Sequence, residues 1–147
     1  MSRAQPEPRS AYKAFVPIST RWADNDLYGH VNNVVYNSWF DTAVNTLLIE
    51  GGALEPAAGD CIGFVVETQC HYFSPLAFPQ PVLAGVRVAH VGRSSVRYEV
   101  GIFPGAESEA GLDCAARGHF IHVYVDRTSR RPMPIPTRLM SVLESLT

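Results

Sequence analysis

The stretch "NVVYNSWFDTAVNTLLIEGG", residues 33–52, decides the fold. Its apolar side chains recur in pairs four residues apart, which is the spacing of one face of an α-helix. These side chains are Val35, Tyr36, Trp39, Phe40, Ala43, Val44, Leu47 and Leu48. Asn37 and Asp41 lie on the opposite face, and Gly51 with Gly52 supplies a stop signal. The pattern predicts an amphipathic helix of about 16–18 residues, roughly 25 Å long, whose apolar face needs a sheet to cover it.

Outside this helix, apolar residues alternate with polar ones, which is typical of β-strands. The alternating segments are residues 12–18, 64–72, 82–90, 96–102 and 114–125. Tight turns between the last four favour an antiparallel meander, and "PGAESEAG" (residues 104–111) is expected to be a hairpin tip. Pro136 begins a short amphipathic helix. The predicted fold class is therefore α+β, with one long central helix wrapped by a mostly antiparallel five-stranded sheet.

The composition is that of one ordinary globular domain. The 147 residues suit a single domain, expected at residues 12–147, whereas residues 1–11 are expected to form a flexible N-terminal tail. A formal charge of −2 argues against nucleic acid as a partner. Three cysteines without CxxC spacing indicate neither a disulfide framework nor a zinc site. No signal-peptide pattern and no apolar run of roughly 20 residues is present, so we expect a cytoplasmic protein without a membrane partner.

A polar segment, "RWADNDLYGHVNN" (residues 21–33), directly precedes the helix. The N-terminus of a helix offers unpaired N–H groups that can stabilise an oxygen as it becomes anionic. A carboxylate beside such a donor suits acyl hydrolysis, and Asp24 and Asp26 are both candidates that spacing does not separate. The alternative is structural, with Asn32 as a helix cap and His30 as a hydrogen-bond donor.

A second candidate site lies at Arg93, Ser94 and Ser95, at a turn-to-strand junction. Guanidinium and hydroxyl groups together can bind a phosphate-bearing ligand, but the same residues also suit an ordinary polar hairpin turn. His119 and His122 are three residues apart in a strand, so they face opposite sides and make a poor metal pair. No metal site is therefore predicted.

The segment before the helix also resembles a known signature. "RWADNDLYGHVNNVVY" contains every fixed position of D-x-D-x-x-G-H-V-N-N-x-x-Y, the pattern of the hotdog-fold acyl-CoA thioesterases of the 4-hydroxybenzoyl-CoA thioesterase type. The resemblance continues through "ETQCHYFSPLAFPQPVLAGVRVAHVGRSSVRY" and "HFIHVYVDRTSRRPMPIP", and covers roughly residues 12–138. It implies the hotdog fold and hydrolysis of an acyl-CoA thioester to a free acid and CoA.

The resemblance also implies a role for individual residues. Asp26 would be the catalytic carboxylate, acting as nucleophile or as general base for water. The backbone N–H near Asn33 would polarise the thioester carbonyl, and Gly29 and His30 would shape the turn, with His30 orienting Asp26 or a water. The CoA moiety would lie along Arg93, Ser94 and Ser95 at a subunit interface, with no metal or other cofactor.

One departure from the family concerns the helix. Relatives often carry Glu-x-Ala-Arg where residues 41–44 read Asp-Thr-Ala-Val, so the arginine is missing here, together with any contact that it makes to substrate. Two other functions are compatible with the sequence: an acyl-thioester hydratase or dehydratase of the same fold, and a non-catalytic acyl-CoA-binding module. Because a single hotdog sheet has exposed edges, we expect a homodimer joined through edge strands, with further assembly to a homotetramer as an alternative.

Overall fold

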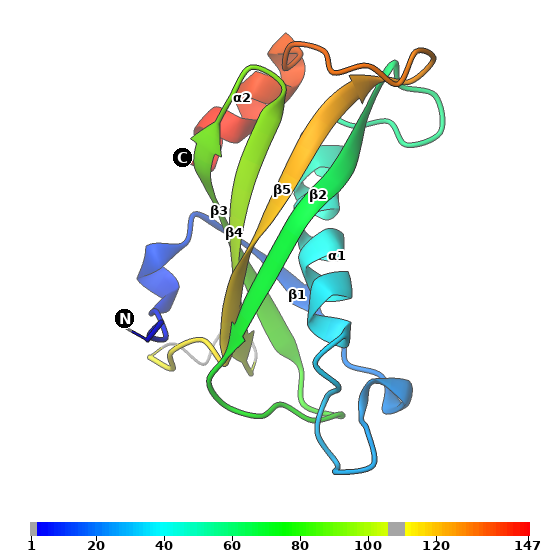
Figure 1. Cartoon of the computed structure of the whole chain (residues 1–147). Helices are drawn as coiled ribbons and strands as arrows, with labels where there is room; N and C mark the ends of the chain where they lie inside the picture. Colours follow the sequence, from blue (N-terminus) through cyan, green and yellow to red (C-terminus); the bar gives the residue numbers. More distant parts are fainter. Residues whose placement is uncertain (1–2, 106–110) are drawn as a thin grey trace.

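The computed structural model describes residues 3–105 and 111–147, and its strands form one sheet beside one long helix (Figure 1). In chain order the elements are η1 (Arg9–Ala11), β1 (Ala14–Ile18), η2 (Trp22–Asp24), α1 (Val35–Glu50), β2 (Cys61–Tyr72), β3 (Val82–Val91), β4 (Ser95–Pro104), β5 (Ala116–Asp126) and α2 (Thr137–Ser145). This order confirms the α+β class. Most of the expected hairpin tip at residues 104–111 lies outside the described residues.

The sheet is antiparallel throughout, with the strand order β1-β3-β4-β5-β2. The sequence favoured a meander of β2 to β5, but β2 pairs with β5 and not with β3. The connection from β2 to β3, residues 73–81, contains three prolines and nine residues, so it crosses the end of the sheet where a tight turn cannot. The result is a curled sheet with β1 at one edge and β2 at the other.

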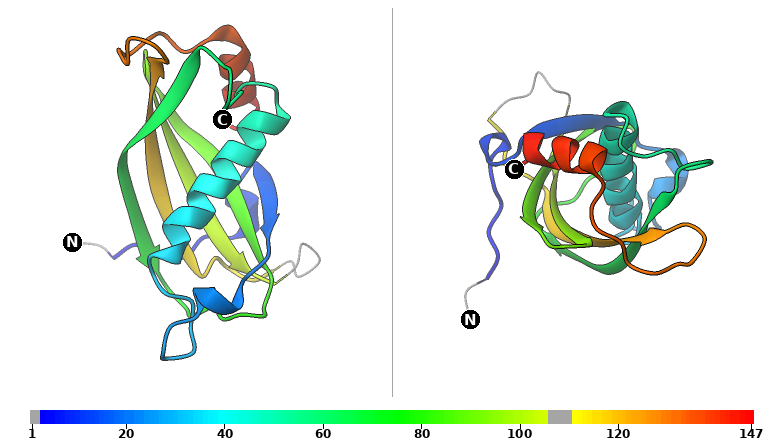
Figure 2. Two further views of the ribbon diagram at one scale, coloured as in Figure 1. Left: turned by 90° about the vertical axis from the view of Figure 1, so that its right-hand side faces the viewer. Right: turned by 90° about the horizontal axis from the view of Figure 1, so that it is seen from above.

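Helix α1 lies against the concave face of this sheet (Figure 2). Its 16 residues agree with the predicted length, and six of the eight side chains predicted to face the core are buried, whereas Val35 and Leu47 are partly buried. The six buried side chains are Tyr36, Trp39, Phe40, Ala43, Val44 and Leu48. They pack on inward-facing residues of β3, β4 and β5, and Leu139 and Leu143 of α2 complete the same cluster. The hydrophobic face of α1 therefore fixes where the segment before it enters the fold.

The opposite face of the sheet carries a smaller aromatic cluster, formed by Tyr12 with Leu83, Phe103 and Cys114. The ring of Tyr12 lies on Gly101 and its strand partner, and a Cβ atom on Gly101 would sit 2.6 Å from Cζ of that ring. Only a residue without a side chain fits beneath the tyrosine. This position explains a glycine in the middle of a strand, where it otherwise weakens the sheet.

The N-terminal segment differs from the expected flexible tail. Glu7 forms an ion pair with Arg87 of β3 at 3.0 Å, and its carbonyl accepts a hydrogen bond from the Cys114 N–H at 3.0 Å. Burial alone would raise the pKa of Glu7, but hydrogen bonding and charge attraction from Arg87, with Arg117 nearby, hold that pKa below its usual value. Proline and charge are typical of loose ends, but here the charges have partners on the sheet.

The two sheet edges differ in length and exposure. β1 has five residues and carries Pro17, which cannot donate a hydrogen bond to a further strand. β2 has twelve residues, and Phe64, Val65 and Val66 are 40%, 46% and 59% exposed. A long, apolar, unpaired edge is a template for another strand. β2 is therefore the edge that is open to pairing with a second chain.

One histidine is buried in the core. His122 on β5 is 3% exposed, and its Nδ1 lies 3.1 Å from the hydroxyl of Tyr124, which in turn lies 2.7 Å from the hydroxyl of Tyr98. Burial lowers the pKa of His122 to about 4, so the ring is neutral at neutral pH. His119 lies on the other face, with its Nε2 2.6 Å from Glu67. The two histidines point apart, as their spacing predicts.

Candidate active site

In the first half of the polar segment, Arg21 to Asp24, the polar side chains bond to one another. The Asp24 side chain is fully buried, and its carboxylate accepts hydrogen bonds from the backbone N–H, the Nε and a terminal nitrogen of Arg21 at 2.8, 3.0 and 2.8 Å. The carbonyl of Asp24 accepts a further bond from the Asn32 N–H at 2.8 Å. Asp24 is therefore a structural residue that holds the start and the end of the loop together.

The second half, residues 26–30, is an exposed turn that presents Asp26. The Asp26 N–H donates to the carbonyl of His30 at 2.9 Å, and the Gly29 N–H donates to the carbonyl of Asp26 at 3.1 Å. Gly29 has φ +81°, a conformation that glycine adopts without strain. One carboxylate oxygen of Asp26 accepts the Tyr28 N–H at 2.8 Å. Within the described residues its other oxygen has no recorded partner, so it is available to a ligand.

The entrance to α1 supplies a free hydrogen-bond donor. The Val31 N–H donates to the carbonyl of Leu76 at 2.7 Å, and the Val34 N–H donates to Oδ1 of Asn32 at 3.1 Å. The Val35 N–H donates to the carbonyl of Asn32 at 3.0 Å. The Asn32 side chain therefore closes a turn just before the helix, but it is not the expected cap, because the N-cap residue is Val34 and has no side-chain cap hydrogen bond. Between these bonded groups, the Asn33 N–H has no recorded acceptor in the described part of the chain.

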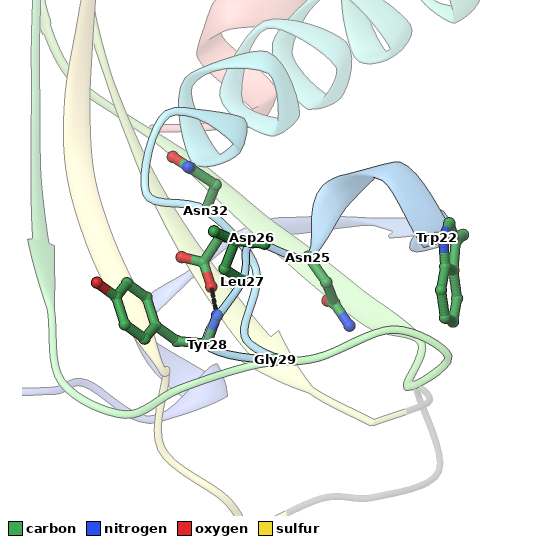
Figure 3. Close-up of a pocket in the computed structure, with 7 residues that line it drawn as sticks. All are labelled: Trp22, Asn25, Asp26, Leu27, Tyr28, Gly29 and Asn32. Carbon is green, nitrogen blue, oxygen red and sulfur yellow. Dashed lines mark hydrogen bonds between the residues drawn. The ribbon is translucent and has the colours of Figure 1, made fainter.

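Asp26 lies between two hollows on the surface. The larger, with a volume of about 690 Å³, is formed by the loop itself and includes Trp22, Leu27 and Tyr28 (Figure 3). The smaller, about 370 Å³, lies between the loop and β2. It is lined by Asp26, His30, Val31, Asn33, Tyr36, Tyr72, Phe73, Ser74 and Pro75. A carboxylate and the residue with the free N–H thus line the same hollow, which is the pairing that the sequence predicted for acyl hydrolysis.

His30 lines the smaller hollow with Asp26, and its side chain is exposed. No hydrogen bond of the His30 ring to Asp26 is recorded among the described residues, so any orienting action would pass through a water or a substrate. Gly29 lines the larger hollow and shapes the turn through its positive φ. Both residues lie in the turn that presents Asp26, without a direct hydrogen bond from the His30 ring to Asp26, and their roles stay predictions.

Arg93, Ser94 and Ser95 lie at the other end of the sheet. Figure 1 shows the turn between β3 and β4 at the top and the loop before α1 at the bottom. Val123 of β5 pairs with Ser95 on one side and with Phe64 of β2 on the other, so Ser95 and Phe64 lie at the same height in the sheet. Phe64 is eight residues from Tyr72, or roughly 25 Å along a strand. Within a single chain, the turn that contains Arg93, Ser94 and Ser95 is therefore far from Asp26. The carbonyls of Arg93 and Ser94 accept the N–H groups of Ile135 and Tyr124, so the turn also has a structural role.

Two contacts from β2 to the start of α1 were not predicted from the sequence. The Tyr72 hydroxyl donates to the carbonyl of Asn33 at 3.0 Å, and the Thr68 hydroxyl donates to Oδ1 of Asn37 at 3.1 Å. Period-2 alternation places Tyr72 on a strand face, but no local pattern reveals a partner 39 residues away. Burial, with Cys70 nearby, raises the pKa of Tyr72 to about 12, so its hydroxyl keeps its proton at neutral pH.

No helix of the described residues is both long and apolar enough to cross a membrane. Those residues also contain no group of three or more histidine, cysteine or acidic side chains arranged to hold a metal ion.

A five-stranded antiparallel sheet curled around one long helix is the hotdog fold that the sequence predicted. The chain belongs to the thioesterase-like superfamily, whose sequence pattern matches residues 20–143. Among solved structures it is similar to the PA5185 protein from Pseudomonas aeruginosa, with 50% identity, a TM-score of 0.92 and 97% of each chain covered. Family and fold together support a thioester hydrolase.

More distant relatives share the fold. A thioesterase from Thermus thermophilus, solved with coenzyme A and Zn, has 28% identity and a TM-score of 0.73, with 92% of this chain and 95% of that chain covered. A 1,4-dihydroxy-2-naphthoyl-CoA thioesterase from Synechocystis has 17% identity and a TM-score of 0.76, with 90% and 96% covered. At that identity the likeness concerns the fold alone. No curated protein matches this sequence.

Proposed function

We propose that the protein hydrolyses an acyl-CoA thioester to a free acid and CoA. In this reaction Asp26 either attacks the thioester carbonyl carbon or removes a proton from the water that attacks it. The carbonyl oxygen becomes an oxyanion as the new C–O bond forms, and the Asn33 N–H stabilises it. The C–S bond then breaks, and the CoA thiolate leaves and takes up a proton. If an acyl-aspartate forms, a water hydrolyses it in a second step.

One observation carries this proposal: Asp26 and Asn33 line one hollow, and within the described part of the chain one carboxylate oxygen of Asp26 and the Asn33 N–H have no hydrogen-bond partner. A thioester needs a base or nucleophile for its carbon and a hydrogen-bond donor for its oxygen, and this hollow offers both. Asp24 does not compete for the role, because its carboxylate is buried and bonded to Arg21. The geometry therefore favours Asp26 over Asp24, as the resemblance implied.

CoA as the carrier is supported by the Thermus thermophilus thioesterase, which was solved with coenzyme A. Arg93, Ser94 and Ser95 are proposed to bind the phosphate-bearing part of CoA across a dimer. Antiparallel pairing of two β2 edges turns the second chain end for end, so its turn moves to the Asp26 end of the first chain. This pairing explains how residues roughly 25 Å apart along one sheet can serve one site.

A homodimer through β2 is therefore part of the proposal, and a homotetramer is a further assembly compatible with it. The exposed apolar residues of β2 support the pairing, because an unpaired edge of this length leaves its N–H and C=O groups in water. A Val66→Lys variant places a charge on that edge. We expect it to sediment as a monomer and to lose activity, whereas a wild-type monomer in solution would contradict the dimer. The cytoplasmic location stays a prediction.

The decisive experiment is an assay of short-chain, medium-chain, long-chain and aromatic acyl-CoA substrates by release of free thiol. We expect thiol release from at least one class. A hydratase would change an enoyl-CoA without releasing thiol, and a binding module would bind CoA esters saturably without turnover. Either of these results would contradict the proposed hydrolysis.

A further inference from the structure

We propose that Tyr72 is a positioning residue that holds the Asn33 backbone in the orientation needed for the oxyanion. The inference rests on the proposed function, because it concerns the donor used there. The contact is a single hydrogen bond of 3.0 Å from the Tyr72 hydroxyl to the carbonyl of Asn33. Tyr72 comes from the edge strand β2, whereas Asn33 stands just before α1, so the bond ties two separate elements at the site.

The other bonds around Asn33 show what this one adds. The peptide that carries the Asn33 N–H is fixed through the carbonyl of Asn32, which accepts the Val35 N–H at 3.0 Å. The peptide that follows Asn33 is held by two side chains: Oδ1 of Asn32 accepts its N–H, and Tyr72 donates to its carbonyl. Without Tyr72, the carbonyl of that second peptide keeps only a long contact of 3.4 Å from the Tyr36 N–H. Rotation about Asn33 would then tilt the free N–H.

The Tyr72 ring is itself held in place, which a positioning residue requires. It packs edge-to-face on the Tyr36 ring with centroids 5.0 Å apart, and Tyr36 is buried on the inner face of α1. The raised pKa of Tyr72 means that the hydroxyl remains a donor throughout the physiological range. Tyr72 is 43% exposed at the edge of the hollow. Core packing therefore does not explain why its hydroxyl lies where it does.

A second contact repeats the connection one helical turn further on. Thr68 lies four residues before Tyr72 on β2, and its partner Asn37 lies four residues after Asn33. Both side chains thus reach from the same strand to the same side of the helix start. The Thr68 bond is a turn away from the donor, so its loss should disturb the donor less than the loss of the Tyr72 bond.

The first test compares three conservative variants in steady-state kinetics. For Tyr72→Phe, which removes only the hydroxyl, we expect kcat to fall about tenfold with KM within about twofold, because the donor acts on the transition state. Thr68→Val should lower kcat by about two- to threefold. Tyr12→Phe is the matched control: it also removes a tyrosine hydroxyl, bonded to Glu7 at 3.2 Å, but on the far face of the sheet, so kcat should stay unchanged.

A purely structural role of Tyr72 would give a different result. If Tyr72→Phe unfolds at the wild-type temperature and keeps the wild-type kcat, the inference is wrong. It is also wrong if the Tyr12→Phe control loses as much kcat as Tyr72→Phe. The Tyr72 comparison uses only variants that keep Asp26, so it does not depend on which step Asp26 performs.

The second test measures directly the hydrogen bond from the Asn33 N–H to the thioester carbonyl. An acyl-CoA with an isotope-labelled thioester carbonyl is bound to Asp26→Asn, and its carbonyl stretch is measured by difference infrared spectroscopy. A hydrogen bond from the Asn33 N–H lowers the stretching frequency. We expect the added Tyr72→Phe substitution to shift the band toward that of the free thioester, and an unmoved band would overturn the inference. If Asp26→Asn instead hydrolyses the substrate at the wild-type rate, the proposed role of Asp26 fails while the kinetic test of Tyr72 stands.

Discussion

The two halves of the segment before α1 have similar polar residues and opposite environments. In the first half, Asp24 is buried, and its carboxylate accepts three hydrogen bonds from Arg21. In the second half, Asp26 keeps one carboxylate oxygen free, and the Asn33 N–H has no recorded partner among the described residues. The difference shows that a polar residue stabilises a loop when its hydrogen bonds are satisfied, and is available for chemistry when they are not.

The largest effect that tests this contrast is expected for Asp26→Asn. The amide keeps the size and can still accept the Tyr28 N–H, but it is neither a base nor a nucleophile. We expect kcat to fall at least about a hundredfold, within the range for loss of a positioned base, while the melting temperature stays near that of the wild type. Thiol-release kinetics and thermal unfolding measure the two quantities. Near-wild-type turnover would show that the exposed half is not the catalytic one.

A second test extends the contrast to the histidines. His122 is buried, with its pKa lowered to about 4 from 6.5, so the unfolded chain binds its proton more readily than the folded one between those values. Stability due to this residue is therefore highest above pH 6.5 and falls as the pH drops toward 4. The loss between pH 7 and pH 5 is about 2 kcal/mol. Denaturant unfolding of His122→Phe should show a smaller pH dependence than the wild type by about that amount; an equal dependence would contradict the burial argument.

A third test removes the buried carboxylate. Asp24→Ala leaves the Arg21 N–H without its acceptor and ends the ion pair, so we expect a loss of about 1–3 kcal/mol in the free energy of unfolding. Because Asp24 does not contact the hollow, kcat per folded molecule should stay within a few-fold of the wild type. Denaturant unfolding with active-site titration separates the two effects. A stable but inactive Asp24→Ala variant would reverse the roles of the two aspartates.

The smallest effect is expected for His30→Gln. His30 lines the hollow but makes no recorded side-chain hydrogen bond to Asp26, so its influence would pass through a water or the substrate. We expect kcat to fall by about tenfold or less, with unchanged stability. A loss as large as that of Asp26→Asn would mean that His30 acts directly on the reacting atoms.

Several features were predictable because their signal is local. The apolar pairs of residues 35–48 predicted α1 to within two residues, since one helix face repeats along the chain. The loop before it was predicted to be a cap or a catalytic turn. The Asn32 side chain accepts the Val34 N–H just before the helix, the Asn33 N–H has no acceptor among the described residues, and the catalytic role stays a prediction. The α+β class followed from the change of period between helix and strands.

Other features depend on contacts between distant residues, and the sequence does not show them. β2 lies beside β5 because a nine-residue connection crosses the sheet, and strand alternation contains no information about neighbours. The bond from Tyr72 to Asn33 and the ion pair from Glu7 to Arg87 join residues 39 and 80 positions apart. Spacing alone could not separate Asp24 from Asp26, because what separates them is the burial of one carboxylate beside Arg21.

The docked N-terminal segment has a consequence for the smallest unit that can fold. The family pattern begins at residue 20, but Tyr12 fills the space above Gly101, and β1 ends at Ile18. A chain trimmed to residues 20–143 would lose that strand and expose the second edge of the sheet, together with Leu83 and Phe103 on its outer face. Such a chain should aggregate when expressed, although it contains the whole signature segment before α1. The boundary of sequence similarity and the boundary of the folding unit are therefore different positions in this protein.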